Sequence, residues 1–178
     1  LQALEEADHL KGDFPVFQIT SYADIADFHI QCFNTSHDSA DSCGYTIELS
    51  NGIKTAVATD LGVVTDEVEN ALLGSKTLLL ESNHDINMLQ TGPYPYYLKR
   101  RILSESGHLC NDDAAQTVLK LVANGAEHIL LGHLSSENNY PDLAFQTTKS
   151  VMDSAGVLLD KDYTLTVASR HEPKMVMI

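Results

Sequence analysis

The order of apolar and polar positions divides the chain into two parts with different periodicities. In the first part, short stretches at residues 16–20, 28–33 and 45–49 mix apolar and polar side chains in alternation, and a Ser-Asn-Gly turn follows. The alternation resumes at residues 54–59. A period of two is typical of strands with one buried face, and the turn predicts that the last two strands form a hairpin.

From Thr65 onward the pattern predicts helices that alternate with strands. Thr65 and Asn111 each precede acidic residues and an apolar stripe at helical spacing, so each is predicted to cap a helix. Pro141 opens a third helix. Between these helices, the apolar runs at 77–80 and 129–131 predict buried strands, and a final strand is expected near the C-terminus, at 163–168. Hairpins followed by strand–helix units indicate an α/β fold, with a mixed sheet and helices on one face.

The composition indicates a single globular domain over residues 1–178. The chain is 43% hydrophobic and 20% charged, which is an ordinary globular balance and excludes a disordered chain. No apolar run approaches the ~20 residues of a bilayer-crossing helix, and the acidic start lacks the features of a signal peptide. The three cysteines form no Cys-x-x-Cys motif, which is typical of reduced thiols. We therefore expect a cytoplasmic protein without a membrane segment.

The charge narrows the classes of function. With 25 acidic and 11 basic side chains, the formal net charge is −14, which argues against binding nucleic acid through a broad basic face. Bound metal ions would still allow such a chain to approach phosphate groups, because their charge dominates a site locally. The eight histidines are the first indication of such a metal site.

Polar side chains gather just past the predicted strand ends. His37 and Asp38 follow the second strand, Asp60 follows the fourth, and His133 follows the strand at 129–131. Because ligands of open α/β sheets bind beyond the carboxyl ends of strands, and imidazole and carboxylate suit Zn²⁺, Mn²⁺ or Fe²⁺, this edge is predicted to bind metal. A structural role is the alternative for each histidine, and it is the preferred interpretation for His9, His29, His128 and His171.

Two features could contact phosphate. Lys99-Arg100-Arg101 is the only basic cluster, and helical spacing turns Lys99 and Arg100 outward, where they could touch backbone phosphates. The alternative is a solvated helix face. His108 and Asn111 lie where a helix begins, and anions bind at helix N-termini. His108 is the candidate for stabilising charge on the phosphate, with a plain loop histidine as the alternative.

Segments from the whole chain together resemble a known superfamily. Four segments resemble the metallo-β-lactamase superfamily: Ser36-His37-Asp38, Ala58-Thr59-Asp60-Leu61-Gly62, residues 80–85 and Leu131-Gly132-His133-Leu134-Ser135. Residues 81–85, 92–104 and 107–111 resemble one bacterial branch of this superfamily, the YycJ/WalJ branch. That branch is linked to metal-dependent 5′ exonuclease activity on DNA. The resemblance implies that the chain is the latter part of a four-layer αββα sandwich.

The resemblance also implies a role for each ligand. His37 corresponds to a ligand of the first metal, Asp60 to the residue that bridges both metals, and His133 to a ligand of the second. Two divalent ions are implied, Zn²⁺ or Mn²⁺, with a hydroxide between them as the nucleophile. Asp60 and His108, the latter through the phosphate contact expected at the helix start, are therefore the candidate catalytic residues. The candidates for orienting these ligands through hydrogen bonds are Asp38, His84 and Asp85.

One signature of the superfamily is missing. The motif His-x-His-x-Asp-His normally lies upstream of the position of His37, and residues 1–33 contain only His9 and His29. We therefore expect a domain that is incomplete at its N-terminal side and binds metal weakly or not at all. The uncovered sheet surface would then be covered by a second copy of the chain or by a complementing N-terminal half.

These observations lead to one expected function and two alternatives. The expected function is divalent-metal-dependent hydrolysis of phosphodiester bonds, 5′ exonuclease-like, with DNA as the partner. The first alternative is a hydrolase of the same fold that acts on a small ester, thioester or cyclic phosphate. The second alternative is a non-catalytic interaction module, which the missing motif favours.

Overall fold

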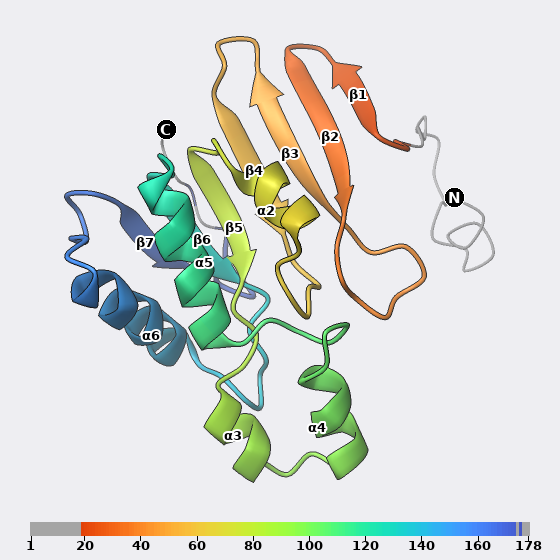
Figure 1. Cartoon of the computed structure of the whole chain (residues 1–178), viewed down its shortest axis with the longest axis vertical. Helices are drawn as coiled ribbons and strands as arrows, with labels where there is room; N and C mark the ends of the chain where they lie inside the picture. The colour runs from red at the N-terminus through yellow and green to blue at the C-terminus, as the bar shows by residue number, and fades with distance from the viewer. Residues whose placement is uncertain (1–18, 174, 176–178) are drawn as a thin grey trace.

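The computed structural model describes residues 19–173 and 175, and one seven-stranded sheet forms its centre. The strands lie side by side in chain order: β1 (Tyr22–Ile25), β2 (Phe28–Asn34), β3 (Cys43–Leu49), β4 (Lys54–Ala58), β5 (Thr77–Glu81), β6 (His128–Gly132) and β7 (Thr164–Val167). Neighbouring strands from β1 to β4 are antiparallel, and those from β4 to β7 are parallel. The predicted α/β fold with a mixed sheet is therefore confirmed (Figure 1).

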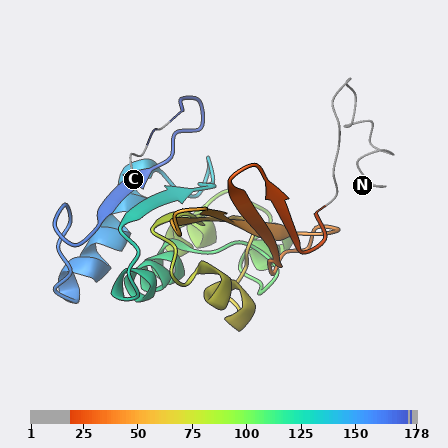
Figure 2. The ribbon, with the colours of Figure 1, turned by 90° about the horizontal axis from the view of Figure 1, so that it is seen from above.

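Helices cover one face of this sheet. The described helices are α2 (Asp66–Leu72), α3 (Ile86–Thr91), α4 (Tyr96–Ile102), α5 (Asn111–Ala123) and α6 (Pro141–Ser154). Seen from above, α2, α5 and α6 lie on the same side of the strands, as predicted (Figure 2). The short helices α3 and α4 extend beyond the carboxyl end of β5 (Figure 1). None of the described helices is both long and apolar enough to cross a bilayer.

The hydrophobic core lies between the sheet and these helices. Alternate residues of the central strands point into it, namely Leu78 and Leu80 of β5 and Ile129 and Leu131 of β6, each at most 1% exposed. Burying such a side chain contributes about 1.5–3 kcal/mol. The packing therefore fixes β5 and β6, whose carboxyl ends carry site residues.

The opposite face of the sheet carries no described helix (Figure 2). Paired positions on neighbouring strands form an apolar row across it, made of Cys32, Tyr45, Val57, Leu79 and Leu130. These side chains are only partly covered, and Tyr45 is 37% exposed. The described part of the chain thus contains one sheet and one helix layer, which is half of the four-layer sandwich that the resemblance implies.

The helix starts follow the predictions with one exception. The Thr65 hydroxyl caps α2, and Pro141 is the first residue of α6. Asn111 does not cap α5. The cap is Cys110, whose Sγ accepts a hydrogen bond from the Asp113 amide at 3.5 Å, while the side chain of Asn111 is buried. Most of the strand predicted at 16–20 lies outside the described residues, and its two described positions belong to no strand.

Candidate metal centre

Three strand ends and one loop bring candidate ligands to one edge of the sheet. β2, β4, β5 and β6 run in the same direction, so their carboxyl ends meet. His37 follows β2, Asp60 follows β4 and His133 follows β6, while His108 comes from the segment between α4 and α5. The topology therefore places together side chains that are far apart in the sequence.

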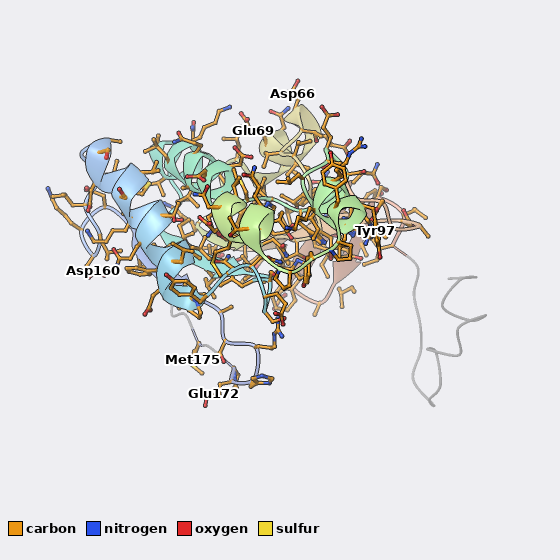
Figure 3. The ribbon with its side chains drawn as sticks, turned by 90° about the horizontal axis from the view of Figure 1, so that it is seen from below. Asp66, Glu69, Tyr97, Asp160, Glu172 and Met175 are labelled. Atoms are coloured by element: carbon orange, nitrogen blue, oxygen red, sulfur yellow. The ribbon has the colours of Figure 1, made fainter. Side chains whose placement is uncertain are left out.

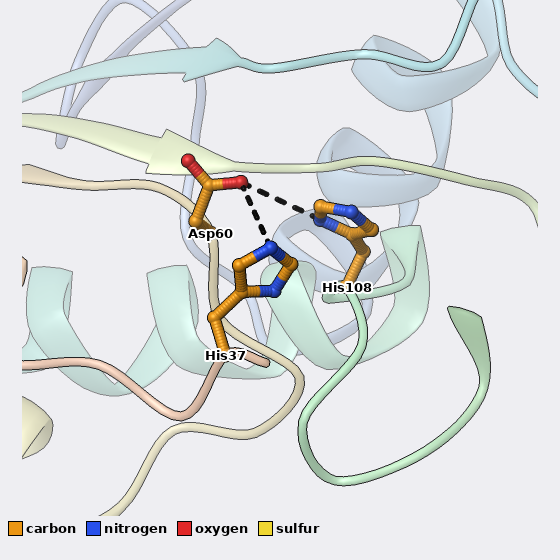
Figure 4. Close-up of side chains that lie close together, drawn as sticks. All are labelled: His37, Asp60 and His108. Carbon is orange, nitrogen blue, oxygen red and sulfur yellow. Dashed lines mark ion pairs between the residues drawn. The ribbon is translucent and has the colours of Figure 1, made fainter. Parts of the chain in front are cut away.

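Asp60 lies in the middle of this cluster. Its Oδ1 is 3.6 Å from Nε2 of His37, 3.7 Å from Nε2 of His133 and 4.0 Å from Nδ1 of His108. Figure 4 shows Asp60 with His37 and His108. The ring centroids of His37 and His108 are 4.7 Å apart, and those of His108 and His133 are 5.3 Å apart. Three imidazoles thus surround one carboxylate.

Glu81, the last residue of β5, is fully buried next to two of these rings. Its Oε1 accepts hydrogen bonds from Nδ1 of His108 at 2.7 Å and from Nδ1 of His133 at 2.8 Å, and its Oε2 accepts one from the Leu61 amide at 2.8 Å. Burial alone would raise the pKa of Glu81, but these hydrogen bonds outweigh it and lower the pKa. Glu81 is therefore a buried carboxylate that fixes two imidazole rings.

Glu81 is the site residue that sequence reasoning missed. The segment that begins at Glu81 contributed to the family resemblance, but the candidates drawn from it were His84 and Asp85. A usable signal was present, because Glu81 ends the otherwise apolar strand β5. An acid at a buried strand end requires partners, since a buried unpaired charge is very costly.

The hydrogen bonds also set the tautomers of the two outer histidines. Nδ1 of His37 donates to the carbonyl of Gly107 at 2.8 Å, and Nδ1 of His133 donates to Glu81. The bond to Glu81 raises the pKa of His133. The tautomer with the proton on Nδ1 has a lone pair on Nε2, the atom that faces Asp60 in both rings, and this is the form in which imidazole binds a metal.

The backbone is unusual at two of the candidate ligands. Asp60 has φ of 57° and His133 has φ of 55°, both in the left-handed region that few residues other than glycine adopt. Such conformations cost about 1–3 kcal/mol and persist where the surrounding structure enforces them, often at functional sites. Here they occur where the chain leaves β4 and β6, beside the cluster.

The donor atoms fit a divalent metal. Two ligand atoms at ~2.1 Å from one tetrahedral ion lie about 3.4 Å apart. Asp60 Oδ1 is 3.6 Å from Nε2 of His37 and 3.7 Å from Nε2 of His133, and both distances are close to this value. An aspartate between two imidazoles is also suited to bridge two ions. His108 differs, because its atom near Asp60 is Nδ1, which donates to Glu81.

Two of the residues expected to orient ligands have other partners. Asp38 Oδ1 is 3.7 Å from Nε2 of His37, but the carboxylate accepts hydrogen bonds from Arg101 at 2.5 and 2.7 Å. This bidentate pair lowers the pKa of Asp38 to about 2. Asp85 caps α3 by accepting the Met88 amide at 2.8 Å. Both residues therefore stabilise segments around the cluster.

The third of these expectations is wrong. His84 is 1% exposed, and neither of its ring nitrogens has a hydrogen-bond partner among the described residues. Burial lowers its pKa to about 4, so the ring is neutral near pH 7. The strand-end position of His84 thus reflects packing, and the hydrogen-bonding role expected of it belongs to Glu81.

Two of the three residues expected to contact phosphate, Lys99 and Asn111, make other hydrogen bonds in the structure. Asn111 is 1% exposed, and its amide group bonds within a buried network of side chains, so a substrate cannot reach it. The Lys99 ammonium donates to two backbone carbonyls near the end of α3, both at 2.7 Å, instead of facing outward. Arg100 is exposed.

Known proteins share both sequence and fold with this chain, although no family model matches it. Exodeoxyribonuclease YycJ from Bacillus anthracis is 36% identical over 154 residues, which are 84% of this chain and 58% of that protein. Exodeoxyribonuclease WalJ from Streptococcus pneumoniae serotype 2 (strain D39 / NCTC 7466) is 31% identical over 166 residues, 91% of this chain and 61% of that protein. The chain therefore spans about 60% of the length of these curated relatives.

The fold has matches among solved structures. The metallo-β-lactamase fold protein YhfI from Bacillus subtilis superimposes with a TM-score of 0.60 at 16% sequence identity, over 93% of this chain and 57% of that one. The sequence likeness and the fold likeness point to the same group of proteins, and the cluster around Asp60 lies at the sheet edge where the resemblance implies metal ligands. The chain belongs to the metallo-β-lactamase superfamily, in its YycJ/WalJ branch.

Proposed function

We propose that the chain is the main part of a divalent-metal-dependent hydrolase that cleaves phosphodiester bonds in DNA, as a 5′ exonuclease. The observation that carries the proposal is the position of Asp60, with one carboxylate oxygen within 4 Å of Nε2 of both His37 and His133. The names of the relatives, both exodeoxyribonucleases, support DNA as the substrate.

The residues of this chain have distinct roles in the proposal. His37, Asp60 and His133 hold up to two divalent ions, Zn²⁺ or Mn²⁺. When bound, such ions polarise the phosphate and lower the pKa of a water molecule. Glu81 holds the rings of His108 and His133 in place through their Nδ1 atoms. His108, 19% exposed at its side chain, contacts the phosphate and stabilises its charge.

The chain supplies fewer ligands than two ions require. Each tetrahedral ion takes about four ligands, and the described residues offer His37, Asp60 and His133 in suitable tautomers. We therefore propose that metal binding by this chain is weak, and that the uncovered face of the sheet takes a second copy or a complementing N-terminal half.

The test measures metal binding and cleavage of single-stranded DNA by the 178-residue chain, with Mn²⁺ and with Zn²⁺. Asp60→Ala should reduce both binding and cleavage by about 100-fold or more. Asp66→Ala is the matched control, because Asp66 is an exposed acid at the start of α2 (Figure 3) and takes part in none of the contacts of the cluster. Undiminished cleavage in Asp60→Ala, or a wild-type chain that neither binds metal nor cleaves, would contradict the proposal.

A further inference from the structure

Asn83 lies two residues beyond Glu81, in the segment that leaves β5. It is 8% exposed and makes hydrogen bonds in several directions. Its side-chain amide donates from Nδ2 to the carbonyl of His133 at 2.8 Å, and its own carbonyl accepts a bond from the Ser135 amide at 2.8 Å. Asn83 therefore holds the chain on both sides of Leu134, in the loop that carries one of the proposed metal ligands.

The orientation of the Asn83 side chain follows from the chemistry of its partner. A backbone carbonyl accepts hydrogen bonds and donates none, so the group that faces the His133 carbonyl must be the NH₂ of the amide. Within the described part of the chain, the strand pairing of β6 ends one residue earlier, at Gly132. The Asn83 amide thus supplies the donor for a carbonyl that lies just outside the sheet.

This hydrogen bond also bears on the backbone of His133, which has φ of 55°. A left-handed conformation at a residue other than glycine persists where the surrounding contacts enforce it. The bond from Asn83 to the His133 carbonyl and the bond from the Ser135 amide to Asn83 are two such contacts, one on each side of the turn.

Glu81 and Asn83 act on different parts of the same histidine. The Glu81 carboxylate accepts a hydrogen bond from Nδ1 of the His133 ring, whereas the Asn83 amide bonds to the backbone of that residue. Because the ring can reach Glu81 only where the backbone presents it, the contact with Asn83 supports the contact with Glu81. Both contacts lie behind the ring, on the side away from Nε2, which is 3.7 Å from Asp60.

The main chain of Asn83 bonds to a second loop of the site. Its backbone amide donates to the Leu109 carbonyl at 2.8 Å, next to His108. Since this bond does not involve the side chain, a substitution at position 83 leaves its donor in place. A change of the Asn83 side chain should therefore affect His133 and spare His108, whereas a general loss of stability would disturb both rings.

We propose that Asn83 is a positioning residue of the metal centre, whose side-chain amide holds the His133 backbone in the conformation that directs Nε2 toward Asp60. The inference rests on the proposed function, because it takes His133 as a metal ligand. The rival role is a direct contact with substrate, since Asn83 also lines a cleft of about 1050 Å³ that His108 and His133 border.

The test is ¹⁵N NMR of the metal-free 178-residue chain at pH 9, where both rings are neutral, in the variants Asn83→Leu and Asn83→Asp. Both substitutions remove the N–H donor at similar side-chain volume, and only the second adds a charge. In each variant His133 should change from the form protonated at Nδ1 to a mixture of tautomers, while His108 keeps its wild-type shifts. Zinc affinity, measured by competition with a chromophoric chelator, should fall by about tenfold, as is usual when a group that orients a metal ligand is lost.

Asn124→Leu and Asn124→Asp are the matched controls. Asn124 follows the last turn of α5, at the opposite end of that helix from His108, and its Nδ2 donates to the Lys120 carbonyl at 2.8 Å. The controls therefore lose the same kind of hydrogen bond, from a side-chain amide to a backbone carbonyl. They should keep the wild-type shifts of both histidines and a zinc affinity within about twofold of the wild type.

Unchanged His133 shifts in both Asn83 variants, or equal changes in His108 and His133, would overturn the inference. So would a raised KM for a chromogenic phosphodiester with unchanged kcat and unchanged His133 shifts, which is the result expected of a substrate contact.

Failure of the proposed function gives a different pattern. If the wild type neither binds zinc nor cleaves phosphodiesters, while the Asn83 variants still alter His133 alone, Asn83 does position His133 and the nuclease assignment fails. If the wild type binds zinc and cleaves, while the Asn83 variants leave His133 unaltered, only the role of Asn83 is wrong.

Discussion

Glu81 shows how one buried carboxylate can organise several other side chains. It accepts hydrogen bonds from two imidazoles through the same oxygen, Oε1, and from the Leu61 amide through the other. A carboxylate behind a metal-binding histidine fixes the tautomer of the ring and raises its basicity as a ligand. At this site the same group also orients His108, so the two rings depend on a shared anchor.

We predict that Glu81→Gln weakens Zn²⁺ binding by about 10- to 100-fold, the usual cost of losing such a partner. The neutral amide still fills the space but is a weaker acceptor for two Nδ1–H groups. In the metal-free wild type, ¹⁵N NMR should show His108 and His133 protonated at Nδ1, and the variant should show mixed tautomers. Identical ¹⁵N shifts in the two proteins would show that Glu81 does not set the tautomers.

His84 adds a pH dependence to the stability of the fold. Burial lowers its pKa from 6.5 to about 4, so the unfolded chain binds more protons than the folded one between these values. Stability contributed by the neutral ring is therefore fully present above pH 6.5 and is lost as pH falls toward 4. The full effect is ~3 kcal/mol, since each pKa unit corresponds to about 1.4 kcal/mol.

We predict that His84→Met, which cannot titrate and leaves no buried nitrogen unbonded, flattens this dependence. Urea unfolding at pH 7.5 and pH 5 measures it. The wild type should lose more stability than the variant between the two pH values, while at pH 7.5 the variant should be at least as stable. Equal losses in both proteins would mean that His84 is not buried as a neutral ring.

At the scale of elements, the site depends on close contacts between loops. Gly62, two residues after Asp60, packs against the backbone of the segment that carries His108: a Cβ at Gly62 would lie 2.3 Å from the carbonyl oxygen of Glu105. The segment around His37 is tied to the same loop, because the Asp38 amide donates to the Ser106 carbonyl at 3.1 Å. Loops after β2, β4 and α4 therefore hold one another in place.

We predict that Gly62→Ala separates these loops, destabilising the fold by about 1–3 kcal/mol and weakening metal binding by about tenfold or more. The control is Gly74→Ala at the end of α2. Nothing lies within 4 Å of its Cβ position, but φ of 79° makes alanine strained there. That control should lose stability, by roughly 1 kcal/mol, and keep its metal affinity. Equal effects on metal affinity would contradict the loop contact.

The sequence predicts the elements well and the contacts between them poorly. Periodicity and turn residues locate β2 to β6 and the long helices, because these depend on neighbouring positions. The same reasoning places a cap at Asn111, which is wrong, and turns Lys99 outward, whereas its ammonium donates to two backbone carbonyls. Each of these side chains forms hydrogen bonds with groups that are distant in the sequence or lie in another element. The local sequence pattern does not reveal such contacts. His37, Asp60 and His133 could be singled out because strand ends meet at one edge.

At the scale of the whole molecule, the sheet has one packed face and one uncovered face. The apolar row from Cys32 to Leu130 crosses the uncovered face, and a contiguous, partly exposed apolar surface of this kind favours association. The four-layer sandwich that the resemblance implies also leads us to expect association through this face, because the described residues supply only two of its layers.

We predict that the 178-residue chain self-associates through this face. Tyr45→Lys places a charge in the apolar row and should shift sedimentation velocity profiles toward the monomer. Gln31→Lys is the control, because Gln31 is exposed on β2 but one position away from the row, so its side chain points to the other face. A wild type that stays monomeric at all concentrations, or equal shifts in both variants, would contradict the prediction.

The central claim is that an aspartate and two histidines from three strand ends hold a divalent metal. Anomalous diffraction at the zinc edge, from crystals grown with Zn²⁺, tests it most directly. The account predicts a peak about 2.0–2.2 Å from an Asp60 carboxylate oxygen and from Nε2 of His37 or His133. Zinc bound only at other residues, with no anomalous density beside Asp60, would contradict it.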